Sequence, residues 1–312
     1  MSVGWVAGSV RARAMASRRL GRDAALQLAT SPTPEAAVDL LARTTYGRHV
    51  HVGQTTAQAE RGILQALVWN ARVLAGWTTR DGVAILRTLV APLEILTIEE
   101  HLQRLTRAGT EPGPAPSPLE LGGLATAWPR VRGTGTPTAV RAALAASAWG
   151  DPGGDSPREV LLWLRCSAAD RVTLVAPSAA AWAASSTALL LARELLTGAG
   201  PLPPLAAQAA SRVVGQSAAH VRRFTDLADA LPRSARSVLE EVSGPAELWR
   251  AEARWWLTVE RDSEELVRAP RPGPDVLVGA GGLLATDAWR VRAALQVASH
   301  GAEGLEVFRA AA

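Results

Sequence analysis

One stretch of this chain occurs twice, and its repetition limits the possible folds more than any other feature. Residues 33–47 read TPEAAVDLLARTTYG, and residues 136–150 read TPTAVRAALAASAWG. Each copy begins with Thr-Pro, which is typical of a helix start, because the threonine oxygen accepts a first-turn N–H and proline needs no partner there. Each copy ends in glycine, which often follows a helix. The repeat predicts similar helical units about 100 residues apart.

The two copies also agree between their ends. The matched positions are Leu41 with Leu144, Ala42 with Ala145, Thr44 with Ser147, and Tyr46 with Trp149. A third and weaker copy keeps the order Pro232, Leu239 and Gly244 but lacks the threonine. The sequence therefore suggests that the helical unit occurs three times, with the third copy the most divergent.

Two stretches rich in proline or glycine, 110–118 and 198–204, lie between the copies. Proline lacks the N–H that a helix interior requires, so these stretches interrupt the helical sequence and mark domain boundaries. At 312 residues the chain also exceeds the size of a usual single core. We therefore expect three similar domains, at residues 1–112, 113–204 and 205–312.

The composition favours helices throughout. Ala, Leu and Arg are the commonest residues, and together with Glu they are strong helix formers, whereas alternating runs of Val, Ile and Thr are scarce. Hydrophobic residues make up 48% of the chain, which is ample for a buried core. The expected fold class is all-α. The eleven tryptophans, Trp149 and Trp182 among them, are expected to be mainly core aromatics, with a binding face as the alternative.

Charge and cysteine content exclude several classes of protein. All 33 basic residues are arginines and 29 acidic residues interrupt them, so the net charge of +4 does not predict nucleic acid binding. A single cysteine, Cys166, excludes an internal disulfide and fits a reducing compartment. Arg11 interrupts the N-terminal apolar residues before they reach the length of the apolar core of a secretory signal. Residues 172–192 are uncharged over a membrane-spanning length, but Pro177 interrupts them, so we expect a buried helix or helix pair.

Three possible sites of chemistry do not complete their usual patterns. Residues 276–282 end in glycines like a dinucleotide-binding turn, but Leu284 stands where the third glycine belongs, and a loop-to-helix junction is expected instead. His49 and His51 lack a third metal ligand at a suitable spacing, and Cys166 lies in an apolar helix. We expect no catalytic residue, no cofactor-binding residue and no metal ligand.

The N-terminal residues 3–29 are expected to form one long helix. Arg11, Arg18 and Arg22 then share one stripe of that helix, at spacings of i, i+7 and i+11. The stripe is a candidate surface for an acidic partner. A solvated helix face is the alternative, because runs of charge usually face water.

Three segments of the chain carry the motifs of one known family. Residues 5–15 (WVAGSVRARAM) resemble its opening, in which an aromatic and a small residue precede an Arg-Val-Arg-Ala helix. Residues 35–47 resemble its E…LL…T-x-Y segment. In residues 276–305, Asp287 precedes a Val-Arg pair and a later Gly-Leu, and Asp81 precedes a similar Leu-Arg pair. The family is the C-type subunit of the archaeal and vacuolar-type rotary ATPases, known as the d-type subunit in eukaryotic V-ATPases.

The resemblance implies three similar helical domains in a pseudo-threefold, funnel-shaped arrangement. It implies a non-catalytic central-stalk subunit without a cofactor or small-molecule substrate. Such a subunit would lie in the cytoplasm, peripheral on the inner face of the membrane. Its partners would be the other central-stalk subunits and the membrane proteolipid ring. The alternative is an α-helical ligand-binding protein or enzyme that uses the tryptophans and Gly279–Gly282 as a pocket.

Overall fold

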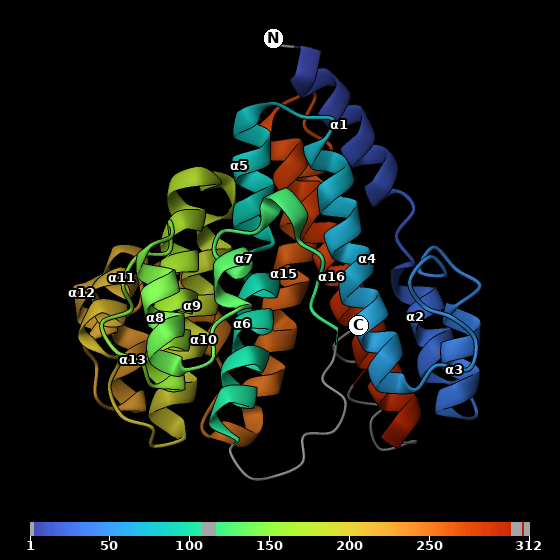
Figure 1. Ribbon diagram of the computed structural model, residues 1–312. Helices are drawn as coiled ribbons and strands as arrows, with labels where there is room; N and C mark the ends of the chain where they lie inside the picture. Colours follow the sequence, from blue (N-terminus) through green and yellow to red (C-terminus); the bar gives the residue numbers. More distant parts are fainter. Residues whose placement is uncertain (1–2, 108–116, 301–307, 309–312) are drawn as a thin grey trace. The chain divides into compact units, whose positions relative to one another are not determined.

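The protein is all-helical throughout the residues that the computed structural model describes, which are 3–107, 117–300 and 308 (Figure 1). This part contains no strand, so the predicted fold class is confirmed. The α-helices are α1 (Val3–Ala16), α2 (Gly21–Ala29), α3 (Pro34–Leu41), α4 (Thr56–Ala75), α5 (Arg80–Leu89), α6 (Ala91–Thr106), α7 (Trp128–Val131), α8 (Pro137–Ala145), α9 (Pro157–Val175), α10 (Ala180–Leu196), α11 (Pro204–Val214), α12 (Gln216–Ala219), α13 (Phe224–Ala230), α14 (Arg233–Arg236), α15 (Leu248–Val267) and α16 (Pro274–His300).

The chain divides into two compact units, each assembled from segments that are far apart in the sequence. Unit 1 comprises Met1–Leu86, Pro116–Gly122 and Trp256–Ala312, and unit 2 comprises Arg87–Ala115 and Gly123–Trp255. The expected division into three domains, and their funnel arrangement, stay predictions. The expected boundary between residues 112 and 113 lies outside the described residues.

Unit 1 is built around α16, which packs against α1, α2, α3 and α4. These helices bury an apolar face because their hydrophobic residues recur at helical spacing. The larger buried side chains of this core are Leu28, Val38, Leu41, Tyr46, Val50, Ile63, Val291 and Leu295. The core therefore joins the first third of the sequence to its end.

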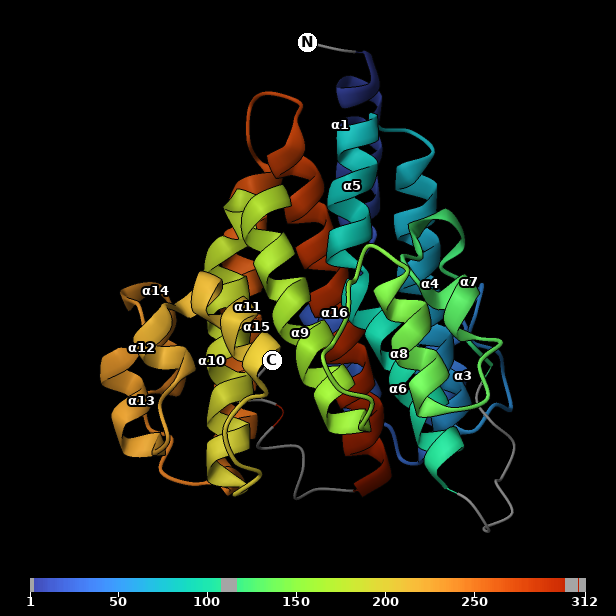
Figure 2. The ribbon, with the colours of Figure 1, turned by 60° about the vertical axis from the view of Figure 1, so that its left-hand side comes forward.

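Unit 2 contains two hydrophobic cores. The first lies among α6, α7, α8 and α9, which Figure 2 shows beside one another. Its larger buried side chains are Ile95, Ile98, Leu102, Trp128, Val140, Leu144, Trp149 and Leu164. The second core lies among α9 to α14 and the start of α15, and it is mostly alanine and leucine. Its alanines allow α11 to pack closely against α9.

The expected single helix over residues 3–29 is wrong, because α1 ends at Ala16 and α2 begins at Gly21. Gly21 has φ +81°, which glycine adopts easily but residues with a side chain rarely do. A continuous α-helix contains no residue with a positive φ, so the helix cannot run through this position. The break lets the chain change direction between the two helices. Arg11 and Arg22 consequently belong to different helices, and the predicted arginine stripe does not exist as one helix face.

The uncharged stretch 172–192 is a pair of helices, as expected. Helix α9 ends at Val175, Pro177–Ala179 form a short 3₁₀ turn, and α10 starts at Ala180. Trp182, Ala188 and Leu191 of α10 are buried in the protein. Among the helices of the described residues, none has both the length and the apolarity needed to span a bilayer.

Candidate functional sites: two buried carboxylates and an arginine pocket

Both copies of the repeated stretch form the predicted capped helix. Thr33 accepts a hydrogen bond from the N–H of Ala36, and Thr136 accepts one from the N–H of Ala139. The two threonines have nearly the same backbone conformation, with φ −142° at each and ψ 158° and 154°. Proline follows as the first helical residue of α3 and of α8. The helix starts therefore agree in side-chain contacts as well as in sequence.

The turns that follow these helices also match, bond for bond. Thr44 donates to the carbonyl of Leu41 and accepts from the N–H of Tyr46, at 2.6 and 3.2 Å. In the second copy, the hydroxyl of Ser147 donates to the Leu144 carbonyl at 2.7 Å and accepts from the Trp149 N–H at 3.0 Å. Each turn directs its aromatic side chain into the core. The aromatic pair is thus placed by the same local bonds.

In unit 1, the aromatic side chain meets the buried carboxylate of Asp287. The Tyr46 hydroxyl donates to Asp287 Oδ2 at 2.8 Å. The other donors are the backbone N–H groups of Leu20, at 3.0 Å, and Gly21, at 2.8 Å. Asp287 on α16 therefore caps the start of α2, where free N–H groups and the helix dipole favour a negative charge. We call this arrangement the Asp287 cap.

In unit 2, Glu94 of α6 makes the equivalent arrangement. Its Oε1 accepts from three successive N–H groups, those of Thr126, Ala127 and Trp128, at 2.7–2.8 Å. Its Oε2 accepts from the indole Nε1–H of Trp149 at 3.2 Å. These N–H groups lead into α7, so Glu94 caps that helix as Asp287 caps α2. We call this arrangement the Glu94 cap.

Both carboxylates are buried, and their contacts are hydrogen bonds to the protein itself. Asp287 is 2% exposed and Glu94 is 1% exposed, and protein donors occupy both oxygens of each. Buried charges of this kind are stable only when they are fully hydrogen-bonded. Burial, followed by the charge of Asp287, raises the pKa of Tyr46 well above its ordinary value. The phenol therefore keeps its proton and remains a donor.

The sequence motifs pair Asp287 with Asp81, but a different acid has the contacts of Asp287 in the structure. Asp81 lies exposed near the start of α5, whereas Glu94, which those motifs do not single out, has the contacts of Asp287. The sequence does not single out Glu94. Ile98 and Leu102 follow it at i+4 and i+8, as Val291 and Leu295 follow Asp287, but Ile85 and Leu89 follow Asp81 at the same spacing. Only the fold separates the two acids, because it buries Glu94 and leaves Asp81 exposed.

A second buried charged group in unit 1 joins α15 to α16. The guanidinium of Arg290, which is fully buried, donates to both oxygens of Glu260, at 3.0 and 2.8 Å. Burial alone would raise the pKa of Glu260, but the bonds from Arg290 and Arg22 outweigh it and leave the pKa lowered. The carboxylate is therefore ionised. Removing Glu260 would leave the buried Arg290 without its acid, whereas removing Arg290 would leave Glu260 with Arg22 as its remaining partner.

The three arginines proposed as a partner surface have different environments. Arg22 donates to Glu260 at 2.6 Å, and Arg11 lies over the ring of Trp77, 5.4 Å from its centroid. Arg18 is exposed and makes no side-chain hydrogen bond or ion pair among the described residues. Arg22 is exposed too, but its ion pair with the buried Glu260 makes it part of the fold, whereas Arg11 and Arg18 have no acidic partner there.

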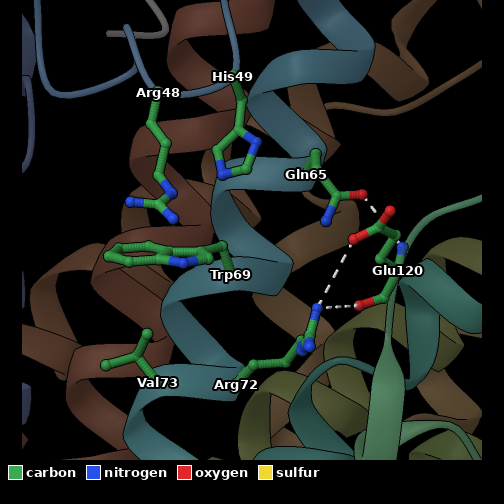
Figure 3. A pocket seen from close by; sticks show the side chains of 7 residues that line it. All are labelled: Arg48, His49, Gln65, Trp69, Arg72, Val73 and Glu120. Atoms are coloured by element: carbon green, nitrogen blue, oxygen red, sulfur yellow. Dashed lines mark hydrogen bonds and ion pairs between the residues drawn. The ribbon is translucent and has the colours of Figure 1, made fainter.

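An open pocket of about 450 Å³ lies in unit 1, lined by both polar and apolar side chains (Figure 3). The lining residues are Arg48, His49, Gln65, Trp69, Arg72, Val73 and Glu120. Arg48 stacks over the indole of Trp69, with 4.6 Å from its guanidinium carbon to the ring centroid. Arg72 donates to the backbone carbonyl of Glu120 at 3.1 Å. Of this group, only His49 stands out in the sequence.

The glycine-rich stretch after Val276 lies inside α16, so the expected loop-to-helix junction is wrong. A Cβ at Gly279 would lie 2.7 Å from the carbonyl oxygen of Ser263 and 2.8 Å from Leu266 Cβ. The glycine therefore permits close packing of α16 on α15. A dinucleotide-binding turn does not form there.

The remaining candidate groups also have structural environments. No three His, Cys, Asp or Glu side chains in the described residues are grouped closely enough to hold a metal ion. Cys166 is fully buried, and burial raises the pKa of its thiol to about 12, which makes it unreactive at neutral pH. Trp149 and Trp182 are buried core aromatics, as predicted, and Trp128 is buried too. The wider expectation that the eleven tryptophans are mainly core is not met, because Trp77 and Trp249 are exposed and the others are only partly buried. The pocket of unit 1 contains Trp69 but is not lined by several tryptophans.

No protein-family model and no curated protein matches this chain. Its function is therefore inferred from its own residues and from the motifs that they form. Three features of the structure bear on it: two matched carboxylate caps, an arginine pair on the surface of α1 and the loop after it, and one polar pocket.

Proposed function

We propose that this chain is a non-catalytic central-stalk subunit of a rotary ATPase of the archaeal and vacuolar type. In this role it is a socket that receives the central shaft and rests on the membrane proteolipid ring, passing torque between them. Its site would be cytoplasmic, peripheral on the inner face of the membrane. The partners are the other stalk subunits and the ring, and the chain itself carries out no reaction.

The observation that carries the proposal is the Asp287 cap. Of the three segments that resemble the family, 35–47 supplies Tyr46 and 276–305 supplies Asp287, and the two side chains bond to each other. The first segment, 5–15, lies in α1, which packs against α16. Of the third segment, residues 301–305 lie outside the described residues. The described parts of the three motifs thus lie on helices and turns that pack around α16, which suits a mechanical role.

The repetition of this cap in unit 2 gives further support. A subunit that transmits force needs helices whose ends are fixed, because a frayed helix end yields under load. Asp287 and Glu94 each fix a helix start by two or three backbone hydrogen bonds from inside a core. Charge-assisted bonds of this kind are stronger than neutral ones.

Arg11 and Arg18 form the candidate contact surface. Arg11 is held over Trp77, and Arg18 is exposed in the segment between α1 and α2. Long basic side chains at an exposed rim typically change the rate of association and its salt dependence more than the fold. We therefore assign these two residues, and not Arg22, to contacts with an acidic stalk partner.

The proposal is tested by affinity purification of the tagged chain from gently solubilised native membranes, followed by mass spectrometry. We expect the stalk subunits and the proteolipid to be recovered together. The double variant Arg11→Glu/Arg18→Glu is expected to recover less of the stalk than the control Arg43→Glu, which changes an exposed arginine elsewhere in unit 1. Absence of both partners, in cells that demonstrably express the ATPase, would overturn the proposal.

A further inference from the structure

The pocket of unit 1 is a built arrangement of hydrogen-bond donors. Three segments form it: the residues that follow the first repeat copy, the middle of α4, and the stretch 117–122 (Figure 3). That stretch is fixed on α4 by side chains, because Arg61 donates to the carbonyl of Ser117 and Gln65 accepts from the N–H of Glu120. The pocket walls are therefore held in place by the fold of unit 1 alone.

Arg48 is held in a fixed orientation inside this pocket. Its guanidinium lies flat on the indole of Trp69, and Figure 3 shows Val73 on the other side of that ring. Stacking uses the face of the guanidinium and leaves the N–H groups at its edge available. Those N–H groups have the fork geometry that binds the two oxygens of a carboxylate. Arg48 itself makes no hydrogen bond or ion pair among the described residues.

Two neutral polar groups lie next to Arg48. The bond from the Glu120 N–H to Gln65 Oε1 fixes the side-chain amide, so that its NH₂ group is the end left for a ligand (Figure 3). His49 Nε2 is shielded from water and has no hydrogen-bond partner in the part that the structure describes. Burial first, and then the charge of Arg48, lower the pKa of His49, so the ring is uncharged at neutral pH.

The charge balance of the lining selects the kind of ligand. Arg48 and Arg72 are positive, Glu120 is negative, and His49 is neutral, so the lining residues carry one net positive charge. One charge is matched by a monoanion, whereas a dianion such as HPO₄²⁻, the form of phosphate at mildly alkaline pH, would be left with an unmatched charge close to the Glu120 carboxylate. Arg72 is already bound to Glu120, which leaves Arg48 as the cation that meets the ligand.

We propose that this pocket binds a carboxylate group, held by the edge of the Arg48 guanidinium and the amide of Gln65. The carboxylate comes either from a free small carboxylate or from an acidic side chain of a partner protein. This site is independent of the rotary-ATPase role, because no residue of the pocket is part of the proposed stalk contact.

The test is a titration of the full-length protein followed by NMR of the Arg48 Nε–H and Trp69 indole N–H signals. The probes are sodium acetate, a blocked short peptide with one glutamate, and inorganic phosphate, each at constant ionic strength with chloride as the reference. We expect saturable shifts of both signals with acetate in the millimolar range, because four heavy atoms set a low ceiling on affinity. The signals are assigned with Arg48→Gln and Trp69→Phe.

Variants separate a specific site from general attraction to positive charge. Arg48→Gln is expected to weaken acetate binding at least about tenfold, and Arg48→Lys should weaken it too, since lysine cannot stack and present a fork. The matched control is Arg43→Gln, which removes the same charge from an exposed position five residues earlier and should leave binding unchanged. Equal weakening by Arg43→Gln and Arg48→Gln would overturn the proposal.

The three probes distinguish the source of the carboxylate. Tighter binding of the glutamate peptide than of acetate supports a partner's acidic side chain, and equal or weaker binding of the peptide supports a free carboxylate. Saturation by phosphate at lower concentration than acetate would contradict a site for monoanions. Absence of saturation by acetate and the peptide alike would overturn the site altogether.

Discussion

The Asp287 cap in unit 1 and the Glu94 cap in unit 2 perform the same task with different residues. One uses an aspartate, a phenol and two backbone N–H groups, and the other uses a glutamate, an indole and three. The longer glutamate side chain is paired with the bulkier aromatic residue. Each copy of the repeat therefore places an aromatic hydrogen-bond donor against a buried carboxylate, although the aromatic residue and the acid differ between the two copies.

The caps differ in the distance along the chain that each one closes. Glu94 precedes the amides that it binds by 32–34 residues, whereas Asp287 follows its own by 266 or 267. Unit 2 can therefore form its cap within one continuous stretch. Unit 1 requires α16, so its folding depends on contacts of far higher sequence separation.

The second core of unit 2 has no buried carboxylate that caps a helix in this way. Helix α10 has no acidic residue between Trp182 and Ala192, and its Ser185 donates to the Ser234 carbonyl instead. The Pro232 copy also lacks the threonine that starts α3 and α8. This region is held together by close alanine packing, in keeping with the divergence of the third copy.

The largest effect is expected from removing either carboxylate. Asp287→Ala leaves Tyr46 and two backbone N–H groups without an acceptor, and Glu94→Ala leaves Trp149 and three. Each change should lower the free energy of unfolding by about 3–5 kcal/mol. Guanidinium unfolding followed by circular dichroism measures this loss. Asp81→Ala, at an exposed acid, is the control and should stay within about 0.5 kcal/mol of the wild type.

A smaller effect is expected from the matched leucines of the repeat. Leu41 and Leu144 are both fully buried, so Leu41→Ala and Leu144→Ala should each cost about 2–5 kcal/mol by the same denaturation measurement. Leu40→Ala, at a residue that is 38% exposed, is the control and should cost much less. If the two buried leucines differed as much from each other as either does from Leu40, the two cores would not be equivalent.

Alkaline pH should weaken unit 1 through Tyr46, the one tyrosine of a chain that contains no lysine. The folded state raises the pKa of this phenol, first through burial and then through Asp287. The resulting stabilisation is complete below the unfolded pKa of about 10 and is lost above it by about 1.4 kcal/mol per pH unit.

This pH dependence is measured as unfolding free energy between neutral pH and pH about 11.5. The experiment uses a Cys166→Ala background, because burial raises the pKa of Cys166 and its thiol would add a loss of the same sign. Tyr46→Phe should remove the Tyr46 part of the slope. Tyrosinate absorbance that appears near pH 10 without unfolding would contradict the buried hydrogen bond.

The smallest effect is expected at the helix caps. Thr33→Ala and Thr136→Ala each remove one bond to an exposed first-turn N–H, which is typically worth about 1 kcal/mol. Thr45→Ala serves as the control, because Thr45 lies exposed in the turn that follows α3 and makes no side-chain hydrogen bond among the described residues. Equal losses of unfolding free energy in Thr33→Ala and Thr136→Ala would show that the two copies of the repeat match in the energy of their caps as well as in geometry.

The sequence predicts those features of the fold that local chemistry determines. The Thr33 and Thr136 caps and the break at Pro177 depend on a few neighbouring residues, and each is confirmed. The break before Gly21 escapes prediction because one glycine does not by itself end a helix, and the carboxylate that caps α2 comes from a distant part of the sequence. Buried charges look the same as surface charges in a single sequence, so Glu94 is not recognised there.

The pocket of unit 1 escapes prediction for a related reason. Its residues come from three segments, and only the fold brings Glu120 next to α4. Arg48 and Trp69 are 21 positions apart and share no motif. Contacts between such distant residues follow from tertiary packing, whereas the periodicity of a sequence predicts only the apolar face of each helix.

The most direct test of the two separate caps is amide hydrogen exchange in Asp287→Asn and Glu94→Gln. Each variant keeps the shape of its side chain but removes the charge. Asp287→Asn should speed exchange at Leu20 and Gly21 by at least about tenfold and leave Thr126, Ala127 and Trp128 unchanged, and Glu94→Gln should do the reverse. Unchanged rates at the capped amides in both variants, or the same acceleration at both sites in each, would contradict two independent carboxylate caps.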